Sequence, residues 1–243
     1  MRVPQRLTSG DSDDFLGTLT ADGEEVIFVS NRNATVQVFR QPRTGGRPQL
    51  IVDDEADVSF PRLSPDGSTV LYISTRDDAS GDVCLRPAKG GPRRCLTGSG
   101  SAEVQAFWYP DGKAVGVVSR KGLAGNMALR RLPLSGGAGT EIHPGNLSSP
   151  ALSPDGKWLI WVPVERGSDK VGVAFSMHVG HGLRMRQGDR GKESDLRLAL
   201  PGVTGFPAFS KDGRWLYFTQ YLSDTNGDGR IDGDDHSVLF RVA

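Results

Sequence analysis

The sequence lacks the features that would indicate a nucleic-acid-binding or membrane-spanning protein. Lysine plus arginine equals aspartate plus glutamate at 29 each in 243 residues, so the net charge is zero and gives no support for a basic face. No apolar run approaches the ~20 residues that cross a bilayer. Residues 1–5 lack the apolar core of a secretion signal. We expect no nucleic-acid partner and no transmembrane segment, and either an intracellular protein or a chain whose signal lies outside this sequence.

Recognisable catalytic motifs are also missing. The chain has no nucleophile elbow, no phosphate-binding loop and no dinucleotide fingerprint. It has four histidines, and the short pair His178 and His181 has no nearby carboxylate or cysteine to complete a metal set. The sequence therefore assigns no catalytic residue and no residue that binds an organic cofactor.

What the chain does contain is one tight turn in five copies. In the best copy, Pro65 presets φ for a type I turn, Asp66 bonds to its own backbone, and Gly67 takes the left-handed position that closes a bulged hairpin. The turn glycines stand at positions 23, 67, 112, 156 and 213, separated by 44, 45, 44 and 57 residues. A period in the forties with several short strands is the signature of a β-propeller blade.

Each period divides into four short strands, as one propeller blade does. The first strand precedes the turn, the second follows it, a polar loop leads to the third, and a glycine-rich turn leads to the fourth. The fourth period is longer, and its residues 171–200 read as a lengthened loop around the third and fourth strands, with the basic run 184–192 read as a solvated part of that loop. We predict one all-β domain over residues 1–243, with blades at roughly 11–53, 54–98, 99–143, 144–200 and 201–243.

The two ends of the chain complement each other. Residues 237–241 resemble a third strand with no fourth strand after it, and residues 2–9 resemble a fourth strand with nothing before it. We predict that the N-terminal strand completes the last blade and closes a five-bladed ring, which removes two open sheet edges. A part of a six-bladed or longer array would give the same pattern, so that alternative stays open.

The repeat resembles a known family. Its pattern is P-x-x-S-P-D-G-x-x-hydrophobic-x-aromatic-x-S, then a polar loop with arginine and a G-G-x-P-R-R-x-L-T segment, and it is similar to the TolB-type, WD-repeat-like propeller repeat. Residues 61–97 and 150–162 are the best copies. The resemblance implies a periplasmic or extracellular β-propeller of the bacterial cell envelope that acts as a platform for a protein or peptide partner. TolB-type propellers usually have six blades, whereas five are counted here.

One loop carries recognisable ligand chemistry. Residues 224–235 match D-x-N-x-D-G-x-I-D-x-x-D, which resembles the calcium loop of dockerin modules and, apart from its last residue, that of EF-hands. Ca²⁺ takes six to eight oxygens at about 2.3–2.6 Å. The flanks read as strands, so we predict a structural calcium site without EF-hand helices; the alternative is an acidic turn that binds nothing. The predicted ligands are the side chains of Asp224, Asn226, Asp228 and Asp235, the backbone carbonyl of Arg230, and Asp232 directly or through a water.

The two cysteines form a second candidate feature. Cys84 and Cys95 are placed on the third and fourth strands of the second period, directly opposite each other across a turn at Lys89 and Gly90. A disulfide is geometrically possible and would fit an oxidising compartment. Two reduced core cysteines are the alternative.

The function predicted from these patterns is a calcium-stabilised interaction scaffold that is not an enzyme. Propeller enzymes bring His, Asp, Glu or Arg from several first strands to a central channel, and the first strands here are poor in titratable groups. A propeller hydrolase or lyase is the alternative from the enzyme class. A carbohydrate-binding propeller is the third hypothesis, and it would need an exposed aromatic residue once per blade, which the loops lack.

Overall fold

The computed structural model describes residues 6–8, 10–98, 100–120, 127–136, 138–164, 182–196, 202–229, 231 and 235–243. All regular structure within these ranges is β-strand, and the strands form five antiparallel sheets of the propeller-blade type. The prediction of an all-β fold with five blades is therefore confirmed. The chain divides into two compact units. Unit 1 holds Met1–Trp108, Gly112–Gly125 and Leu132–Gly139, and unit 2 holds Tyr109–Asp111, Asn126–Arg131 and Thr140–Ala243.

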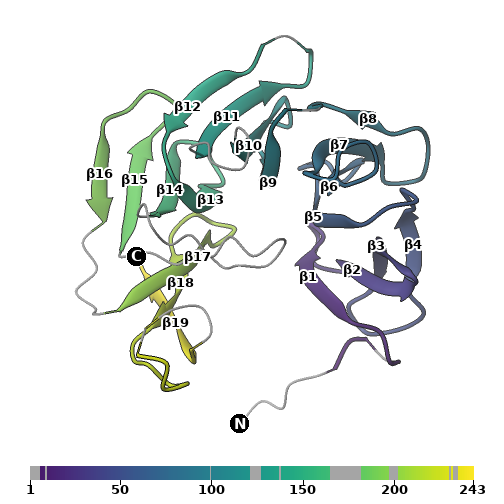
Figure 1. Cartoon of the computed structure of the whole chain (residues 1–243), viewed down its shortest axis with the longest axis horizontal. Helices are drawn as coiled ribbons and strands as arrows, with labels where there is room; N and C mark the ends of the chain where they lie inside the picture. The colour runs from purple at the N-terminus through teal and green to yellow at the C-terminus, as the bar shows by residue number, and fades with distance from the viewer. Residues whose placement is uncertain are drawn as a thin grey trace. The chain divides into compact units, whose positions relative to one another are not determined.

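The first two sheets lie in unit 1, and each follows the chain order without a crossover (Figure 1). The first sheet contains β1 (Asp14–Leu19), β2 (Glu25–Asn33), β3 (Thr35–Pro42) and β4 (Gln49–Val52). The second sheet contains β5 (Val58–Leu63), β6 (Thr69–Ser74), β7 (Asp82–Pro87) and β8 (Arg94–Cys95).

The remaining three sheets have the same simple order. The third sheet contains β9 (Ala102–Trp108), β10 (Ala114–Arg120), β11 (Met127–Pro133) and β12 (Thr140–Pro144), and its residues fall in both units. The fourth contains β13 (Leu147–Leu152), β14 (Trp158–Pro163), β15 (Leu183–Gln187) and β16 (Glu193–Leu196). The fifth contains β17 (Val203–Phe209), β18 (Leu216–Tyr221) and β19 (Ser237–Val242).

The fifth sheet has three strands among the residues that the structure describes. The predicted closing strand, residues 2–9, falls mostly on residues 1–5 and 9, which lie outside the described ranges. The described part, Arg6–Thr8, is not in a strand, and the carbonyl of Leu7 accepts a hydrogen bond of 2.7 Å from Gln41 Nε2 of the first sheet. Closure of the ring by this segment stays a prediction.

The five repeated turns have the predicted backbone. Their glycines all adopt left-handed φ angles, between 66° and 75°, which a residue with a Cβ adopts rarely. In the best copy the Gly67 N–H donates to the Ser64 carbonyl at 2.8 Å, and Asp66 accepts bonds from the Ser64 hydroxyl and the Ser68 amide. These hydrogen bonds lower the pKa of Asp66 to about 2, so the carboxylate that shapes the turn stays charged across the physiological range.

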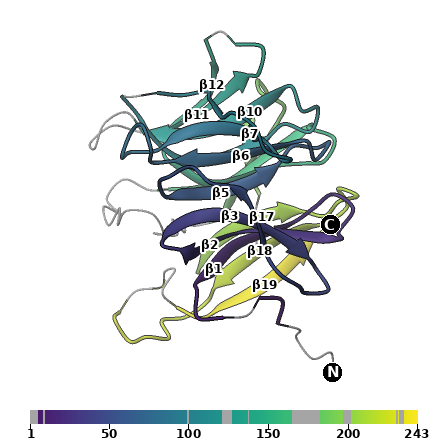
Figure 2. The same ribbon diagram turned by 90° about the vertical axis from the view of Figure 1, so that its right-hand side faces the viewer.

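The buried cores lie between the faces of neighbouring sheets. In unit 1, one cluster joins side chains of the first and second sheets, and Figure 2 shows β1, β2 and β3 beside β5, β6 and β7. A second cluster in the same unit joins the second sheet to β9 and β10. In unit 2, a third cluster joins the fourth and fifth sheets through residues such as Ile160 and Phe218. Burial of these apolar faces holds blade against blade.

Two features differ from the sequence-based expectation or were not foreseen. The basic run 184–192 was predicted to lie in a loop, but Leu183–Gln187 forms β15 because its residues pair with Trp158–Trp161 of β14. All five first strands also carry an irregularity in pairing. In every first strand except β9, a residue other than glycine adopts a left-handed φ at the irregularity: Leu16, Phe60, Ser149 and Phe206.

Candidate functional site

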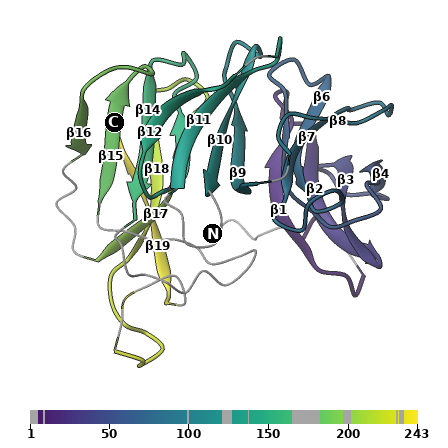
Figure 3. The same ribbon diagram turned by 45° about the horizontal axis from the view of Figure 1, so that its top comes forward.

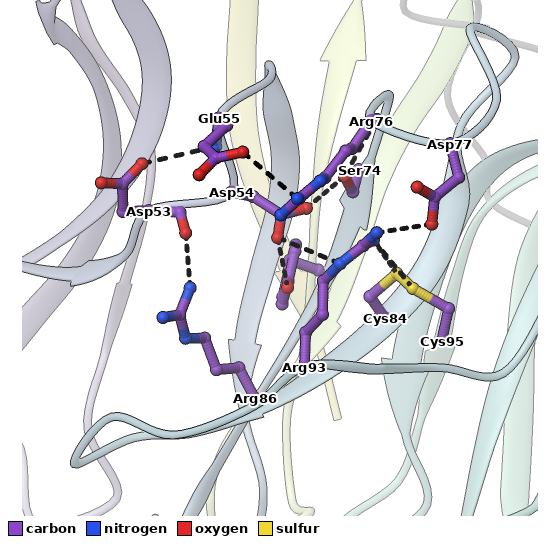
Figure 4. A network of polar contacts seen from close by, with 11 residues as sticks. Asp53, Asp54, Glu55, Ser74, Arg76, Asp77, Cys84, Arg86, Arg93 and Cys95 are labelled. Atoms are coloured by element: carbon purple, nitrogen blue, oxygen red, sulfur yellow. Dashed lines mark hydrogen bonds and ion pairs between the residues drawn. A yellow bond between two sulfur atoms is a disulfide. The ribbon is translucent and has the colours of Figure 1, made fainter.

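A polar network in unit 1 gathers charged side chains, a hydroxyl and the disulfide from five segments of the second blade and its edges (Figure 4). The segment 53–55 follows β4, Ser74 ends β6, and Asp77 lies in the loop before β7. Cys84 and Arg86 lie on β7. Arg93 directly precedes β8, the strand that carries Cys95. The short β7–β8 hairpin therefore holds the Arg93 guanidinium close to the two cysteines.

Asp54 is the centre of this network. Its residue is 0% exposed, and its carboxylate accepts hydrogen bonds from the Ser74 hydroxyl and from the Tyr72 hydroxyl at 3.3 Å. The Arg93 guanidinium lies 3.6 Å from Asp54 Oδ1. Burial and the negative charge of Asp54 raise the pKa of Tyr72, so its hydroxyl stays protonated and acts as a donor. Asp54 is a buried carboxylate whose charge is balanced by one cation.

Arg93 connects this buried carboxylate to the disulfide. The structure joins Cys84 and Cys95, which pair directly across β7 and β8 with Cα atoms 3.9 Å apart. Arg93 Nη1 lies 3.2 Å from the sulfur of Cys95 and 3.8 Å from that of Cys84. Its Nη2 contacts Asp77 Oδ2 at 2.5 Å. One guanidinium thus contacts two carboxylates and both sulfurs.

A second buried carboxylate, Glu103, lies at the start of β9 in the same unit. It is 5% exposed, its Oε1 accepts a bond of 2.6 Å from the Ser101 hydroxyl, and its Oε2 has no hydrogen-bond partner in the described part of the chain. Burial raises the pKa of Glu103 to about 7, against the effect of the Ser101 bond, and the charge of Asp82 adds to the rise. Burial and Asp78 also raise the pKa of Asp82.

Glu103 should make stability depend on pH. Its folded-state pKa of about 7 lies above the ordinary value of 4.5, so the folded chain binds the extra proton and loses stability as pH rises from about 4.5 to 7. The Glu103→Gln variant is therefore expected to melt a few degrees higher than the parent protein at pH 8, with the difference shrinking towards pH 5. Thermal melts between pH 5 and 8 measure this, with the exposed Glu141→Gln as control. Parallel curves for E103Q and the parent protein would contradict it.

A third cluster lies in unit 2, around Arg186 of β15. This residue is 5% exposed and donates to the carbonyls of Ile142 at 2.7 Å and Gly188 at 3.2 Å. Glu193 Oε1 lies 3.6 Å from Arg186 Nη1 and 2.7 Å from Nδ1 of His143. The hydrogen bonds to carbonyls of β12 and of the β15–β16 turn give this cluster a structural role in joining neighbouring strands.

The predicted calcium loop joins β18 to β19 and extends beyond the end of the fifth sheet (Figure 3). Asp224 accepts backbone bonds from Gly227 at 2.6 Å and Gly229 at 2.8 Å, and Asn226 Oδ1 accepts one from Asp228. Asp235, 7% exposed, accepts bonds from the Thr225 amide and hydroxyl and from the Asn226 amide. The predicted flanking strands are present, without EF-hand helices in the described residues.

Two of the six predicted calcium ligands, Arg230 and Asp232, lie outside the described residues, as does the pair His178 and His181. Within the described ranges, no group of three or more His, Cys, Asp or Glu side chains is placed to hold a metal ion. The same ranges contain no helix long and apolar enough to cross a membrane. The calcium site therefore stays a prediction.

Comparison with known proteins found no matching family model. The chain is 36% identical over 232 residues to Tricorn protease homolog 1 of Streptomyces coelicolor, a match that covers 88% of this chain and 20% of that protein. It is 27% identical over 166 residues to the uncharacterized peptidase YuxL of Bacillus subtilis, covering 68% of this chain and 22% of that protein. The chain thus spans about a fifth of the length of these relatives.

Solved structures share the fold at low sequence identity. A putative TolB of Agrobacterium tumefaciens matches with a TM-score of 0.67 and 21% identity, covering 80% of this chain and 69% of that one. An oligogalacturonate lyase of Vibrio parahaemolyticus matches with a TM-score of 0.65 and 13% identity, covering 96% and 67%. These likenesses support the TolB-like propeller fold that the repeat predicted.

The prediction that the protein is not an enzyme is contradicted by these relatives, because both matched sequences have peptidase names and a fold neighbour is a lyase. The prediction rested on this chain's own residues: the missing catalytic motifs and the few titratable groups on the first strands. The matches cover about a fifth of each relative, so most of each relative's residues lie outside the compared region.

Proposed function

We propose that this propeller is a module of a peptidase-type protein and that it binds the polypeptide on which that protein acts. The observation that carries the proposal is the 36% identity over 88% of the chain to a protein named as a tricorn protease homolog. The weaker match to a second peptidase-named protein points to the same class. The TolB-like fold neighbours support a role in which the blades present loops to another polypeptide.

We propose that this protein works in the periplasm or outside the cell. The support comes from the disulfide between Cys84 and Cys95, since such bonds persist in oxidising compartments, and from the TolB-like fold.

Binding of unfolded polypeptide tests the proposed function. Fluorescently labelled casein is titrated with the oxidised chain, and we expect saturable binding in the micromolar range together with competition by unlabelled casein. A folded globular protein of similar charge serves as the control ligand. Oligogalacturonate is tested in parallel for binding and for formation of an unsaturated product. Absence of casein binding up to millimolar concentrations of the chain would refute the proposed function. Lyase activity on oligogalacturonate without casein binding would favour the lyase alternative in its place.

We also propose that the loop 224–235 binds a structural calcium ion in unit 2. Hydrogen bonds from backbone amides to the side chains of Asp224 and Asn226 hold the described part of the loop in tight turns. A loop that presents alternate oxygen ligands to one ion needs such turns. Asp235 packs against the start of the loop through its bonds to Thr225, so the two ends of the predicted ligand set are close together. Calcium would supply charge balance and link β18 to β19; the loop's own residues supply the carboxylates.

A further inference from the structure

The disulfide of the second blade differs in its surroundings from a bond sealed in an apolar core. The Cys84 residue is 0% exposed, whereas the Cys95 residue is only partly buried. Arg93 Nη1 lies within 4 Å of both sulfurs, at 3.2 and 3.8 Å (Figure 4). A positive charge beside a sulfur stabilises its thiolate form, which is both the attacking and the leaving species in thiol–disulfide exchange.

We propose that the Cys84–Cys95 bond is a thiol–disulfide exchange site for an external dithiol, and that Arg93 couples its reduction to the loop 75–81. A thiolate of the dithiol attacks the sulfur of Cys95, the S–S bond breaks, and the electron pair passes to Cys84. The second thiolate of the dithiol then attacks its own bound sulfur and releases Cys95. The dithiol leaves as a disulfide and two electrons have passed to the cysteine pair. Of the two protons that the dithiol gives up, one ends on Cys84 and the other stays in the solvent, so that Cys95 is the thiolate beside Arg93.

The coupling follows from the way in which Arg93 is shared. Besides the sulfurs, its guanidinium faces Asp54 and Asp77, so a thiolate at Cys95 competes with two carboxylates for one cation. The side chain of Asp54 is 1% exposed and cannot lose its cation without leaving an uncompensated buried charge. The side chain of Asp77 is 57% exposed and can be solvated by water instead. Reduction is therefore expected to weaken the Arg93–Asp77 contact first.

The short outer strand adds to this effect. β8 contains two residues, Arg94 and Cys95, so few backbone hydrogen bonds hold it to β7 when the disulfide opens. Arg93 belongs to the same hairpin, and its movement would release the loop that carries Asp77. The consequence of reduction is a local opening at one edge of the second blade, while the cores on both faces of that blade stay packed.

The experiment measures the rate at which dithiothreitol reduces the folded, oxidised chain, followed by alkylation and mass spectrometry. Arg93→Gln is expected to slow reduction at least about five-fold, the effect of one unit charge at about 4 Å even with the dielectric constant of water. Asp77→Asn removes a competitor for Arg93 and is expected to speed reduction. The matched control is Arg94→Gln, whose parent side chain donates to the Leu134 carbonyl at 3.2 Å; its rate is expected to equal that of the parent protein.

Equal rates for R93Q and R94Q would overturn the proposal, as would a reduction rate that does not rise with dithiothreitol concentration, because reduction would then wait for unfolding. Should R93Q fail to fold, the exposed D77N variant decides, and a rate no faster than that of R94Q refutes the role of Arg93. Hydrogen exchange of the oxidised and reduced chains tests the coupling. Faster exchange in residues 75–81 after reduction supports it, and unchanged exchange there refutes it.

Discussion

Replacing Asp54 by alanine is expected to lower the free energy of unfolding by about 3 kcal/mol. The substitution leaves the hydroxyls of Tyr72 and Ser74, both on residues that are 0% exposed, without their carboxylate acceptor. It also removes the buried counter-charge of Arg93. The two buried hydroxyls are left without an acceptor, which costs more than the net gain from forming such bonds. Arg93 keeps Asp77 as its carboxylate partner. Chemical denaturation of the oxidised chain measures the change.

The control for this prediction is the neighbouring Glu55→Ala. Glu55 pairs with Arg76 at 3.2 Å, but both side chains are well exposed, at 75% and 41%, so the pair contributes at most about 1 kcal/mol. The hydroxyls of Tyr72 and Ser74 donate to different oxygens of Asp54, so the Asp54→Asn variant loses the charge and keeps an acceptor for one of the two hydroxyls. Its stability should lie between those of the alanine variant and the parent protein. Equal stability of D54A and E55A would show that the network does not stabilise the blade.

Calcium is expected to raise the melting temperature of the chain by roughly 5–10 °C. A ligand at 100 times its dissociation constant that binds only the folded state adds about 2.7 kcal/mol, and in a chain of this size each kcal/mol moves the midpoint by about 2–4 °C. EDTA should reverse the shift. Asp228→Ala should abolish it, because Asp228 is one of the predicted side-chain ligands. Differential scanning calorimetry with and without calcium measures the shift.

The calcium-dependent difference, rather than the metal-free melting temperature, is the quantity to compare between variants. The Glu141→Ala variant, an exposed carboxylate on β12, serves as the control and should keep the full shift. Magnesium at the same concentration should give a smaller shift, because Mg²⁺ demands near-ideal octahedral geometry and gives up its bound waters reluctantly. A melting curve that does not change between EDTA and millimolar calcium would refute the site.

The sequence predicted the parts of the fold that depend on local chemistry. The turn at Asp66 and Gly67 needs only neighbouring residues, and the strands that follow all five turns lie where the β-branched and aromatic runs placed them. The register that sets Cys84 opposite Cys95 follows from the length of the hairpin turn, and the structure has it. Strand, turn and hairpin are encoded within a few residues, so they can be read from one sequence.

The polar network around Asp54 could not be predicted in the same way. Asp54 meets Ser74 and Arg93 across separations of 20 and 39 residues, and only the packing of β6 against the β7–β8 hairpin brings them together. In the sequence, residues 53–55 look like any acidic turn. Glu103 also looked unremarkable, because its burial depends on the neighbouring blade. A carboxylate that lies near the start of a strand and has few charged neighbours in the sequence is only a weak signal for a buried carboxylate site.

The fourth repeat was misread for a related reason. Its basic residues 184–192 suggested a solvated loop, but Arg184 and Arg186 alternate on β15, one exposed and one buried. Arg186 is stabilised there by the carbonyls of Ile142 and Gly188. A strand with alternating exposed and buried arginines has the same composition as a solvated basic loop. The two can be told apart only when the strand that pairs with it is known.

The left-handed residues in the first strands disfavour shifted registers of strand pairing. Five similar hairpins in one chain could pair with a slip of two residues, which would keep the same side chains facing the core. In β5 a slip of two residues would move the left-handed position from Phe60 to Val58 or Arg62, and a β-branched residue such as valine adopts that conformation only at a cost of about 1–2 kcal/mol. In β5, a slip that moves the left-handed position to Val58 is therefore penalised by the strand's own backbone, in addition to any loss of side-chain packing.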